Sequence, residues 1–208
     1  MSETETPKDA AVRYHHGDLR AALLKAGEEE LAAKGYSGFT LRGTAKRAGV
    51  SHAAPAHHFR DSNALLTALA ARGFARLSAA MREAQAAAAP DPETQFVASG
   101  IGYFRFGMAN PALLQLMFGL GRPGPDDPEL QRNGAEAFGI LVASLSAHAG
   151  LLALESPEGR RMVATAWSIA HGFTMLAVAR RLAFIGEDDP AALERHLAAI
   201  VAAALPRP

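Results

Sequence analysis

Residues 40–59 read TLRGTAKRAGVSHAAPAHHF, and this stretch decides the fold of the amino-terminal part of the chain. Thr40 can cap a short helix, and Ser51 can cap a second one that continues through His58. Gly49 lies between them, where the chain must turn sharply. Two short helices joined in this way form a helix-turn-helix, whose second helix can enter the major groove of DNA. The residues whose spacing indicates the motif are Ala45, Gly49, Val50, Ser51 and Phe59.

The distribution of charge favours a nucleic-acid partner for the same region. The whole chain has 21 basic and 21 acidic residues, and its net charge is zero. Residues 10–60 hold eight Lys or Arg against four Asp or Glu, which makes this stretch +4. A basic region on a neutral protein suits a phosphate backbone. A solvated charged face is the alternative interpretation, and the spacing of the motif makes it the weaker one.

The composition predicts an all-α protein. About a fifth of the residues are Ala, which has the highest helix propensity, and no run alternates apolar and polar residues. The absence of Cys excludes a disulfide scaffold, a thiolate zinc site and a cysteine nucleophile. The amino terminus is polar and the apolar stretches are short, so we expect no signal peptide, no membrane span and a cytoplasmic location.

The pattern of caps, glycines and prolines predicts about nine helices in two domains. We expect a flexible tail over 1–13, a helix-turn-helix domain over 14–62, and a ligand-binding and dimerisation domain over 63–208. The expected helices cover about 18–35, 41–48, 51–58, 62–89, 93–108, a short segment from 111, 128–148, 157–184 and 189–205.

The second domain contains large, flexible apolar side chains that predict a cavity for a hydrophobic small molecule. An ordinary core is the alternative for each of them. Trp167, His171 and Met175 share one helix face, so His171 is either a satisfied core histidine or a hydrogen-bonding group of the cavity. Gly100, Gly102 and Gly107 indicate close helix approach or room for a ligand. The predicted ligand-binding residues are Phe104, Met108, Met117, Phe118, Phe138, Trp167, His171 and Met175.

The last two predicted helices are too apolar for the surface of a monomer. We expect them to pair with the same helices of a second copy, which makes the protein a homodimer with two DNA-reading elements for a palindrome. The residues expected to be exposed on an isolated chain are Leu176, Leu182, Ile185, Leu197, Ile200 and Val201.

Residues 14–74 resemble the DNA-binding domain of TetR-type transcriptional regulators. The residues that support the resemblance are Leu23, Ala26, Gly35, Tyr36, Thr40, Ala45, Ala48, Gly49, Val50, Ser51, His58, Phe59, Leu65 and Leu66. The segments NPALLQLMFG (110–119) and AWSIAHGF (166–173) look like the carboxy-terminal domain type named after its Trp-His-Gly residues, here Trp167, His171 and Gly172.

The resemblance implies a ligand-responsive repressor that binds double-stranded DNA through residues 51–58. It also implies that Arg42 meets DNA and that His58 lies near a phosphate. With the cations of the two short helices, the predicted DNA-binding residues are Arg42, Lys46, Ser51, His52, Ala53, Ala54, His57, His58 and Arg60.

Four positions depart from the family pattern. Ala56 stands where the family usually has a phosphate-binding Tyr, and Ser62-Asn63 replaces a common Lys-Glu, so two phosphate contacts are lost. Pro55 lies inside the predicted second helix, which must therefore be short or begin near Ala54. Thr44 places a hydroxyl at a position that is usually aliphatic.

Other function classes have weaker support. The pairs His15-His16 and His57-His58 suggest a metal, but adjacent side chains on a helix point about 100° apart and rarely bind one ion together. No Gly-rich phosphate loop, HExxH or GxSxG pattern is present, so we expect no cofactor, no metal and no enzymatic activity. The main rival is a helical small-molecule-binding protein that has lost specific DNA binding.

Overall fold

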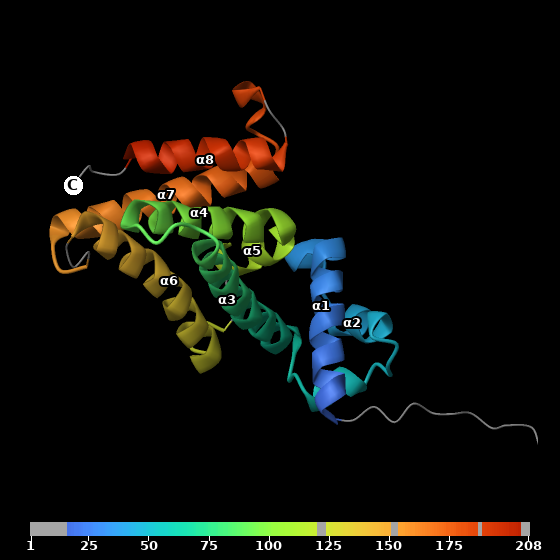
Figure 1. Ribbon diagram of the computed structural model, residues 1–208. Helices are drawn as coiled ribbons and strands as arrows, with labels where there is room; N and C mark the ends of the chain where they lie inside the picture. The colour runs from blue at the N-terminus through green and yellow to red at the C-terminus, as the bar shows by residue number, and fades with distance from the viewer. Residues whose placement is uncertain (1–15, 120–123, 151–153, 187–188, 205–208) are drawn as a thin grey trace, which may run out of the picture.

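The computed structural model describes residues 16–119, 124–150, 154–186 and 189–204, which form eight α-helices, two short 3-10 helices and no strand (Figure 1). The all-α prediction is confirmed, with eight α-helices in place of about nine. The predicted tail over 1–13 lies outside the described residues. The elements are α1 (His16–Gly38), α2 (Leu41–Arg47), η1 (Ala54–His57), α3 (Ser62–Ala86), α4 (Pro92–Ala109), α5 (Pro111–Phe118), α6 (Pro128–Ala149), α7 (Pro157–Val178), η2 (Ala183–Ile185) and α8 (Pro190–Ala204).

Several helices begin with the same local device. Asp91, Asp127 and Ser156 each precede a proline at the first helical position, where a missing N–H costs nothing. Each side chain accepts a hydrogen bond of 2.8–3.0 Å from the backbone N–H three residues later. Asp189 caps α8 in the same way, at 3.1 Å from the Ala192 N–H. These starts lie within one residue of the predicted ones.

Several predicted helix bounds differ from the structure. Helix α1 extends to Gly38, although Gly35, the predicted stop, has a non-helical φ of 66°, and α3 ends at Ala86 and not at 89. The helix expected over 157–184 ends at Val178, because Arg180 takes the left-handed conformation with φ 54°. The Arg180 N–H donates to the Ala177 carbonyl at 2.9 Å and the Arg181 N–H to the Leu176 carbonyl at 2.8 Å. This is a Schellman C-cap with Arg at the position where Gly is usual. At the other end of the chain, α1 already includes Asp18, so the helix begins before the predicted start.

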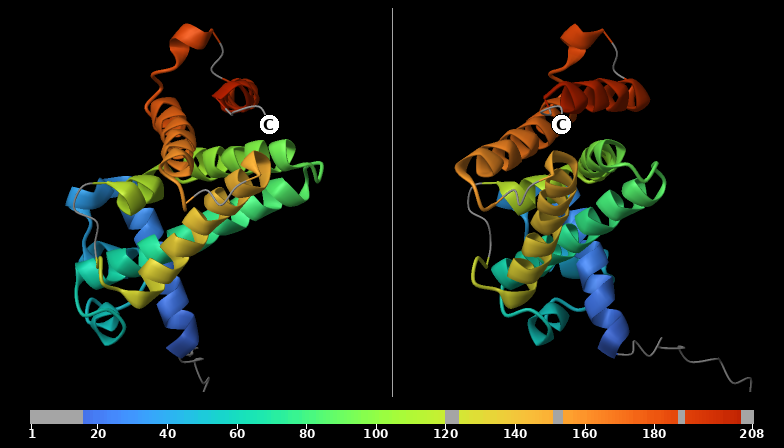
Figure 2. Two further views of the ribbon diagram at one scale, coloured as in Figure 1. Left: turned by 90° about the vertical axis from the view of Figure 1, so that its left-hand side faces the viewer. Right: turned by 60° about the vertical axis from the view of Figure 1, so that its left-hand side comes forward.

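The helices form a small amino-terminal head and a larger body. In this article, the head is α1, α2 and η1, which lie together at one end of the molecule (Figure 1). Helix α3 begins beside the head and runs into the body, where it packs along α4 and α6. Helices α7 and α8 form an outer layer over α4, and η2 projects beyond their ends (Figure 2). The expected boundary between domains, at 62–63, falls at the beginning of α3 and stays a prediction.

One buried cluster joins the head to the body. It contains Leu23 of α1 and Phe59 after η1, and continues through Leu69 of α3 to Tyr103 of α4 and Ile140 of α6. A second cluster lies between α4, α6, α7 and α8. Because the first cluster is continuous, a shift of α3 within the body is transmitted to the packing of the head.

Helix α3 is also the one described helix that is long and apolar enough to cross a membrane by length and composition. However, 61% of its apolar window is buried inside the protein, which is the pattern of a core helix.

The outer layer is less apolar on its surface than the sequence predicted. Leu176 and Ile200 are exposed, at 46% and 41%. The expectation for Leu182, Leu197 and Val201 was wrong, because the three are buried inside the chain. They close the second core cluster, since α7 and α8 pack against each other within one copy. Ile185 is half-buried, while Phe184 beside it is 84% exposed.

Candidate functional site

The head contains the predicted helix-turn-helix in its main features. The Thr40 hydroxyl accepts a hydrogen bond of 2.9 Å from the Gly43 N–H and so caps α2 as predicted. Gly49 has φ 68°, the left-handed conformation that the turn requires. The Val50 N–H donates to the Ala45 carbonyl at 3.1 Å and directs the chain away from α2. Thr44 is fully buried, and its hydroxyl donates to the Thr40 carbonyl at 3.1 Å.

The second element of the motif is not the α-helix from Ser51 that one prediction gave, but it is short and begins at Ala54, as the position of Pro55 indicated. An α-helix capped by Ser51 was expected through His58, but the structure has one 3-10 turn, Ala54–His57, with no side-chain cap. The first bond of that α-helix would join the N–H of residue 55 to the Ser51 carbonyl, and Pro55 has no N–H. The Ala54 N–H donates to the Ser51 carbonyl instead, at 3.0 Å.

This short element still presents its side chains to solvent. Pro55 and Phe59 are buried and hold the segment against the head. The predicted DNA-binding residues that are exposed are Arg42, Lys46, Ser51, His52, Ala53, His57 and Arg60, and Ala54 and His58 are half-buried. The segment that carries these nine residues, from α2 to the beginning of α3, lies at one end of the molecule (Figure 1). We call the nine residues the head surface.

The cations of the head differ in whether they are available to a ligand. Arg42 and Lys46 make no ion pair with any residue that the structure describes. Arg47 is not free, because its Nε lies 2.6 Å from Oε2 of Glu30, a buried carboxylate of α1. Arg60 pairs weakly with Asp61, at 3.1 Å, and its side chain remains 88% exposed. Arg42 and Lys46 are therefore the cations best placed for phosphates.

A polar junction ties the head to the body. Arg76 of α3 donates to Oε2 of Glu28 on α1 at 2.8 Å, and to Oδ1 of Asn110 at 2.6 Å. Asn110 is the residue between α4 and α5, and its amide donates to the Phe106 carbonyl at 2.9 Å. Arg72 also lies 3.4 Å from the Glu28 carboxylate. The junction thus connects α1, α3 and the α4–α5 corner through one guanidinium.

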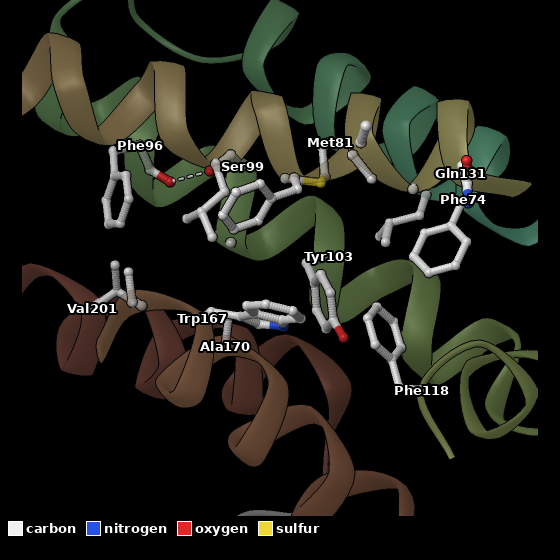
Figure 3. Close-up of a pocket in the computed structure, with 18 of the residues that line it drawn as sticks. Phe74, Met81, Phe96, Ser99, Tyr103, Phe118, Gln131, Trp167, Ala170 and Val201 are labelled. Carbon is white, nitrogen blue, oxygen red and sulfur yellow. Dashed lines mark hydrogen bonds between the residues drawn. The ribbon is translucent and has the colours of Figure 1, made fainter. Parts of the chain in front are cut away.

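The body encloses an apolar cavity of about 480 Å³, which we call the main cavity (Figure 3). This volume is in the usual range for small-molecule sites. Its walls come from α3, α4, α6, α7, α8, the end of α5 and the segment before α6. The lining residues are Phe74, Leu77, Met81, Phe96, Ser99, Gly100, Tyr103, Phe118, Pro125, Gln131, Gly134, Ala135, Ala137, Phe138, Leu141, Ala166, Trp167, Ala170 and Val201.

Three of the predicted ligand-binding residues line the main cavity: Phe118, Phe138 and Trp167. His171 lies just behind the wall, where its Nδ1 shares a hydrogen bond of 2.6 Å with the Tyr103 hydroxyl. The role of all four as ligand contacts remains a prediction.

The other four predicted residues lie elsewhere in the body. Phe104 packs on Phe173 in the second core cluster, with ring centroids 5.9 Å apart. Met117 is buried against Gly73 of α3, and Met175 packs on the first core cluster. Met108 borders a different hollow, beside the Schellman cap of α7. The size of these four side chains indicates burial. Whether a buried side chain lines the cavity or packs in the core depends on how its helix is rotated, which the sequence does not show.

Several wall residues were not among the predicted ligand-binding residues, although Phe96 is one of the large apolar side chains that indicated a cavity. Phe74, Leu77 and Met81 follow one another at spacings of three and four along α3, and Phe96 and Tyr103 are seven residues apart on α4. Both sets form single helix faces. That spacing is a usable signal, although it also describes any buried face.

The glycines of α4 have two distinct roles. A Cβ on Gly102 would lie 2.5 Å from the Ala80 carbonyl oxygen, and one on Gly107 would lie 2.4 Å from the Thr174 methyl group. Gly102 therefore lets α4 pack closely against α3, and Gly107 lets α4 pack closely against α7. A Cβ on Gly100 would lie 4.0 Å from the Val201 side chain, without a clash, and Gly100 lines the main cavity, so it provides space.

The polar groups of the wall are few and mostly engaged. The Ser99 hydroxyl donates to the Phe96 carbonyl at 2.7 Å, and the Gln131 amide to the Pro125 carbonyl at 3.0 Å. Burial lowers the pKa of His171 and raises the pKa of the Tyr103 hydroxyl, so both groups stay neutral near pH 7. No lining residue carries a formal charge. The site therefore suits an apolar ligand, or the apolar part of one.

Within the described ranges, no three His, Asp or Glu side chains are grouped closely enough to hold a metal ion. His15 lies outside those ranges. His57 and His58 differ in exposure, one being exposed and the other half-buried.

Two protein-family models match the chain. Residues 23–69 match the model described as bacterial regulatory proteins of the tetR family, and residues 96–200 match the tetracyclin repressor-like carboxy-terminal domain. The two matches cover the head surface and most of the body. No match was found among curated proteins.

Similar solved structures extend over nearly the whole chain. A Rhodococcus sp. RHA1 protein of unknown function is 31% identical, with a TM-score of 0.77, over 93% of this chain and 98% of that one. A tetR-family regulatory protein from Rhodococcus RHA1 is 17% identical, with a TM-score of 0.70, over 91% and 98%. The regulator FadR from Bacillus subtilis, solved with stearoyl-CoA, is 16% identical, with a TM-score of 0.66, over 89% and 99%.

Proposed function

Because the chain belongs to the TetR family of bacterial regulatory proteins, we propose that it represses transcription by binding a palindromic operator as a homodimer. A hydrophobic small molecule in the main cavity releases the operator. The protein is a DNA-binding regulator in the cytoplasm and not an enzyme.

The observation that carries this proposal is the exposure of the head surface beside unpaired cations. His52 and His57 are exposed in the turn and the 3-10 element, and Arg42 and Lys46 are exposed on α2, which contacts that element. Contacts of Arg42 and Lys46 with phosphates would set the position of the head on the duplex. The exposed histidines and alanines are then left to meet base edges and thymine methyl groups.

The outer layer supports the homodimer. Leu176 and Ile200 are exposed on α7 and α8, and Phe184, in η2 between the two helices, is exposed as well. Large apolar side chains that share one exposed layer are typical of an interface. A dimer formed about a two-fold axis through this layer has two heads, which reach successive major grooves when they lie about 34–36 Å apart.

The main cavity supports response to a ligand. It has an uncharged wall, and the FadR of Bacillus subtilis shows that a protein with this fold can hold a ligand with a long apolar chain. A ligand releases DNA only to the extent that it binds the released state more tightly. Phe74 and Leu77 of the wall flank Arg76, so filling of the cavity acts on the helix that holds the junction with α1.

The test is a fluorescence-anisotropy titration of duplex DNA from the region upstream of the protein's own gene, at several salt concentrations. We expect Arg42→Ala to weaken binding and to reduce the salt slope by about one. His57→Ala should cost about 1–3 kcal/mol on the preferred sequence and less on random duplex. The matched control is Arg132→Ala, because Arg132 is an exposed cation on α6, far along the chain from the head surface. This variant should change neither the DNA affinity nor the salt slope.

The rival function is a helical small-molecule-binding protein that has lost specific DNA binding. The shortened second element and Ala56 favour it. Binding of the wild-type protein to no duplex, or equally to all sequences, would support this rival and refute the repressor.

A further inference from the structure

A second cavity, of about 350 Å³, adjoins the main cavity beside the first turns of α7 and the last turn of α8. We call it the end cavity. Phe96, Ala166 and Val201 belong to the walls of both cavities, so these three side chains form the partition between them. In Figure 3, Phe96 of α4 and Val201 of α8 face each other at one end of the main cavity.

The two cavities differ in chemistry. No charged residue lines the main cavity, whereas Glu158, Arg161 and Thr165 of α7 line the end cavity. Glu158 lies in the first turn of α7, where an acidic side chain is stabilised by the helix dipole. Arg161 is close to the same positive helix end, which gives it no such stabilisation.

Arg161 also makes no ion pair with any described residue. Arg161 is exposed to solvent, and a guanidinium on the wall of a partly apolar hollow can bind an anion. Because the wall of the adjoining main cavity carries no charge, one molecule can fill both hollows if it has an apolar chain and an anionic head.

We propose that the regulatory ligand is such an amphiphile, an inference that rests on the proposed ligand response. Its chain fills the main cavity and passes between Phe96 and Val201, and its anionic head binds Arg161 in the end cavity. The three side chains of the partition are 3–9% exposed, so the chain must displace the Phe96 ring to pass between the cavities. The other two residues of the partition, Ala166 and Val201, belong to α7 and α8. The ligand thus acts directly on the layer proposed to join the two subunits.

The test uses dodecanoate and 1-dodecanol as probes, which share a chain and differ in the head. Trp167 is the sole Trp of the chain and lines the main cavity, so its fluorescence reports occupancy. Titrations are made on the full-length protein, on Arg161→Gln and on Arg132→Gln. Arg132 is the control because it is an exposed cation next to Gln131, at another part of the cavity wall.

We expect Arg161→Gln to weaken dodecanoate about tenfold or more, the scale of a lost charge-assisted hydrogen bond, and to leave dodecanol unchanged. Arg132→Gln should alter neither probe. An unchanged affinity of Arg161→Gln for dodecanoate would overturn the anionic head, and so would an equal loss for both probes. A loss of dodecanoate affinity that is confined to Arg132→Gln would place the anionic head at the opposite end of the main cavity and refute the proposal. Failure of both probes to bind would refute the ligand class, while operator binding, measured separately, would still test the proposed repressor.

Discussion

Replacing Arg76 with Ala tests how the head is held to the body. Arg76 donates to Glu28 at 2.8 Å and to Asn110 at 2.6 Å, and its side chain is 40% exposed. A partly exposed ion pair contributes about 0.2–1 kcal/mol, and a hydrogen bond to a neutral amide contributes about 1 kcal/mol. Arg72 stays 3.4 Å from the Glu28 carboxylate, so the variant leaves no isolated buried charge. We therefore expect the free energy of unfolding to fall by about 1–2 kcal/mol.

The assay is urea unfolding in a double-mutant cycle with Glu28→Gln. We expect a coupling energy of about 0.5–1 kcal/mol, since the two side chains share one contact. Arg82→Ala is the matched control, because Arg82 is on the same helix but pairs with Glu136 of the body. Arg76→Ala should also weaken DNA binding more than Arg82→Ala does, because only the former frees α1. The reasoning is refuted if the coupling energy is zero, or if the two Arg variants lose the same stability and the same DNA affinity.

Three further changes follow from the backbone and the cavity wall. Arg180→Gly should raise the free energy of unfolding by about 0.5–1 kcal/mol, measured by thermal melting, because Gly adopts φ 54° without strain; a lower melting temperature would contradict it. Gly102→Ala should cost about 1–3 kcal/mol through its contact with the Ala80 carbonyl. The control Gly139→Ala, with open space around it, should stabilise by about 1 kcal/mol, and equal effects of the two would refute the packing argument. Because burial lowers the pKa of His171, its neutral form stabilises the fold above the ordinary value of about 6.5, and this stability is lost as the pH falls below it. The fall in unfolding free energy from about pH 7 to about pH 5 should therefore be smaller in His171→Gln, and an unchanged slope would exclude His171 as its source.

Local chemistry determined much of what could be predicted. The Thr40 cap and the left-handed Gly49 depend on residues close to them in the chain, and the structure contains both. The effect of Pro55 is also local, because the missing N–H is a property of the residue itself. The sequence therefore indicated both the helix-turn-helix and the shortening of its second element.

Tertiary structure alone decided which side chains act together. Arg47 was one of three similar cations in sequence, and only the crossing of α1 over α2 places Glu30 at 2.6 Å from it. Likewise, Phe104 and Tyr103 are adjacent, yet one is buried in the core and the other lines the main cavity. Hydrogen bonds within a helix turn depend on neighbours in the chain, so composition and spacing determine them. The wall of a cavity depends on how helices far apart in sequence rotate and cross, and that is set by the packing of the whole chain.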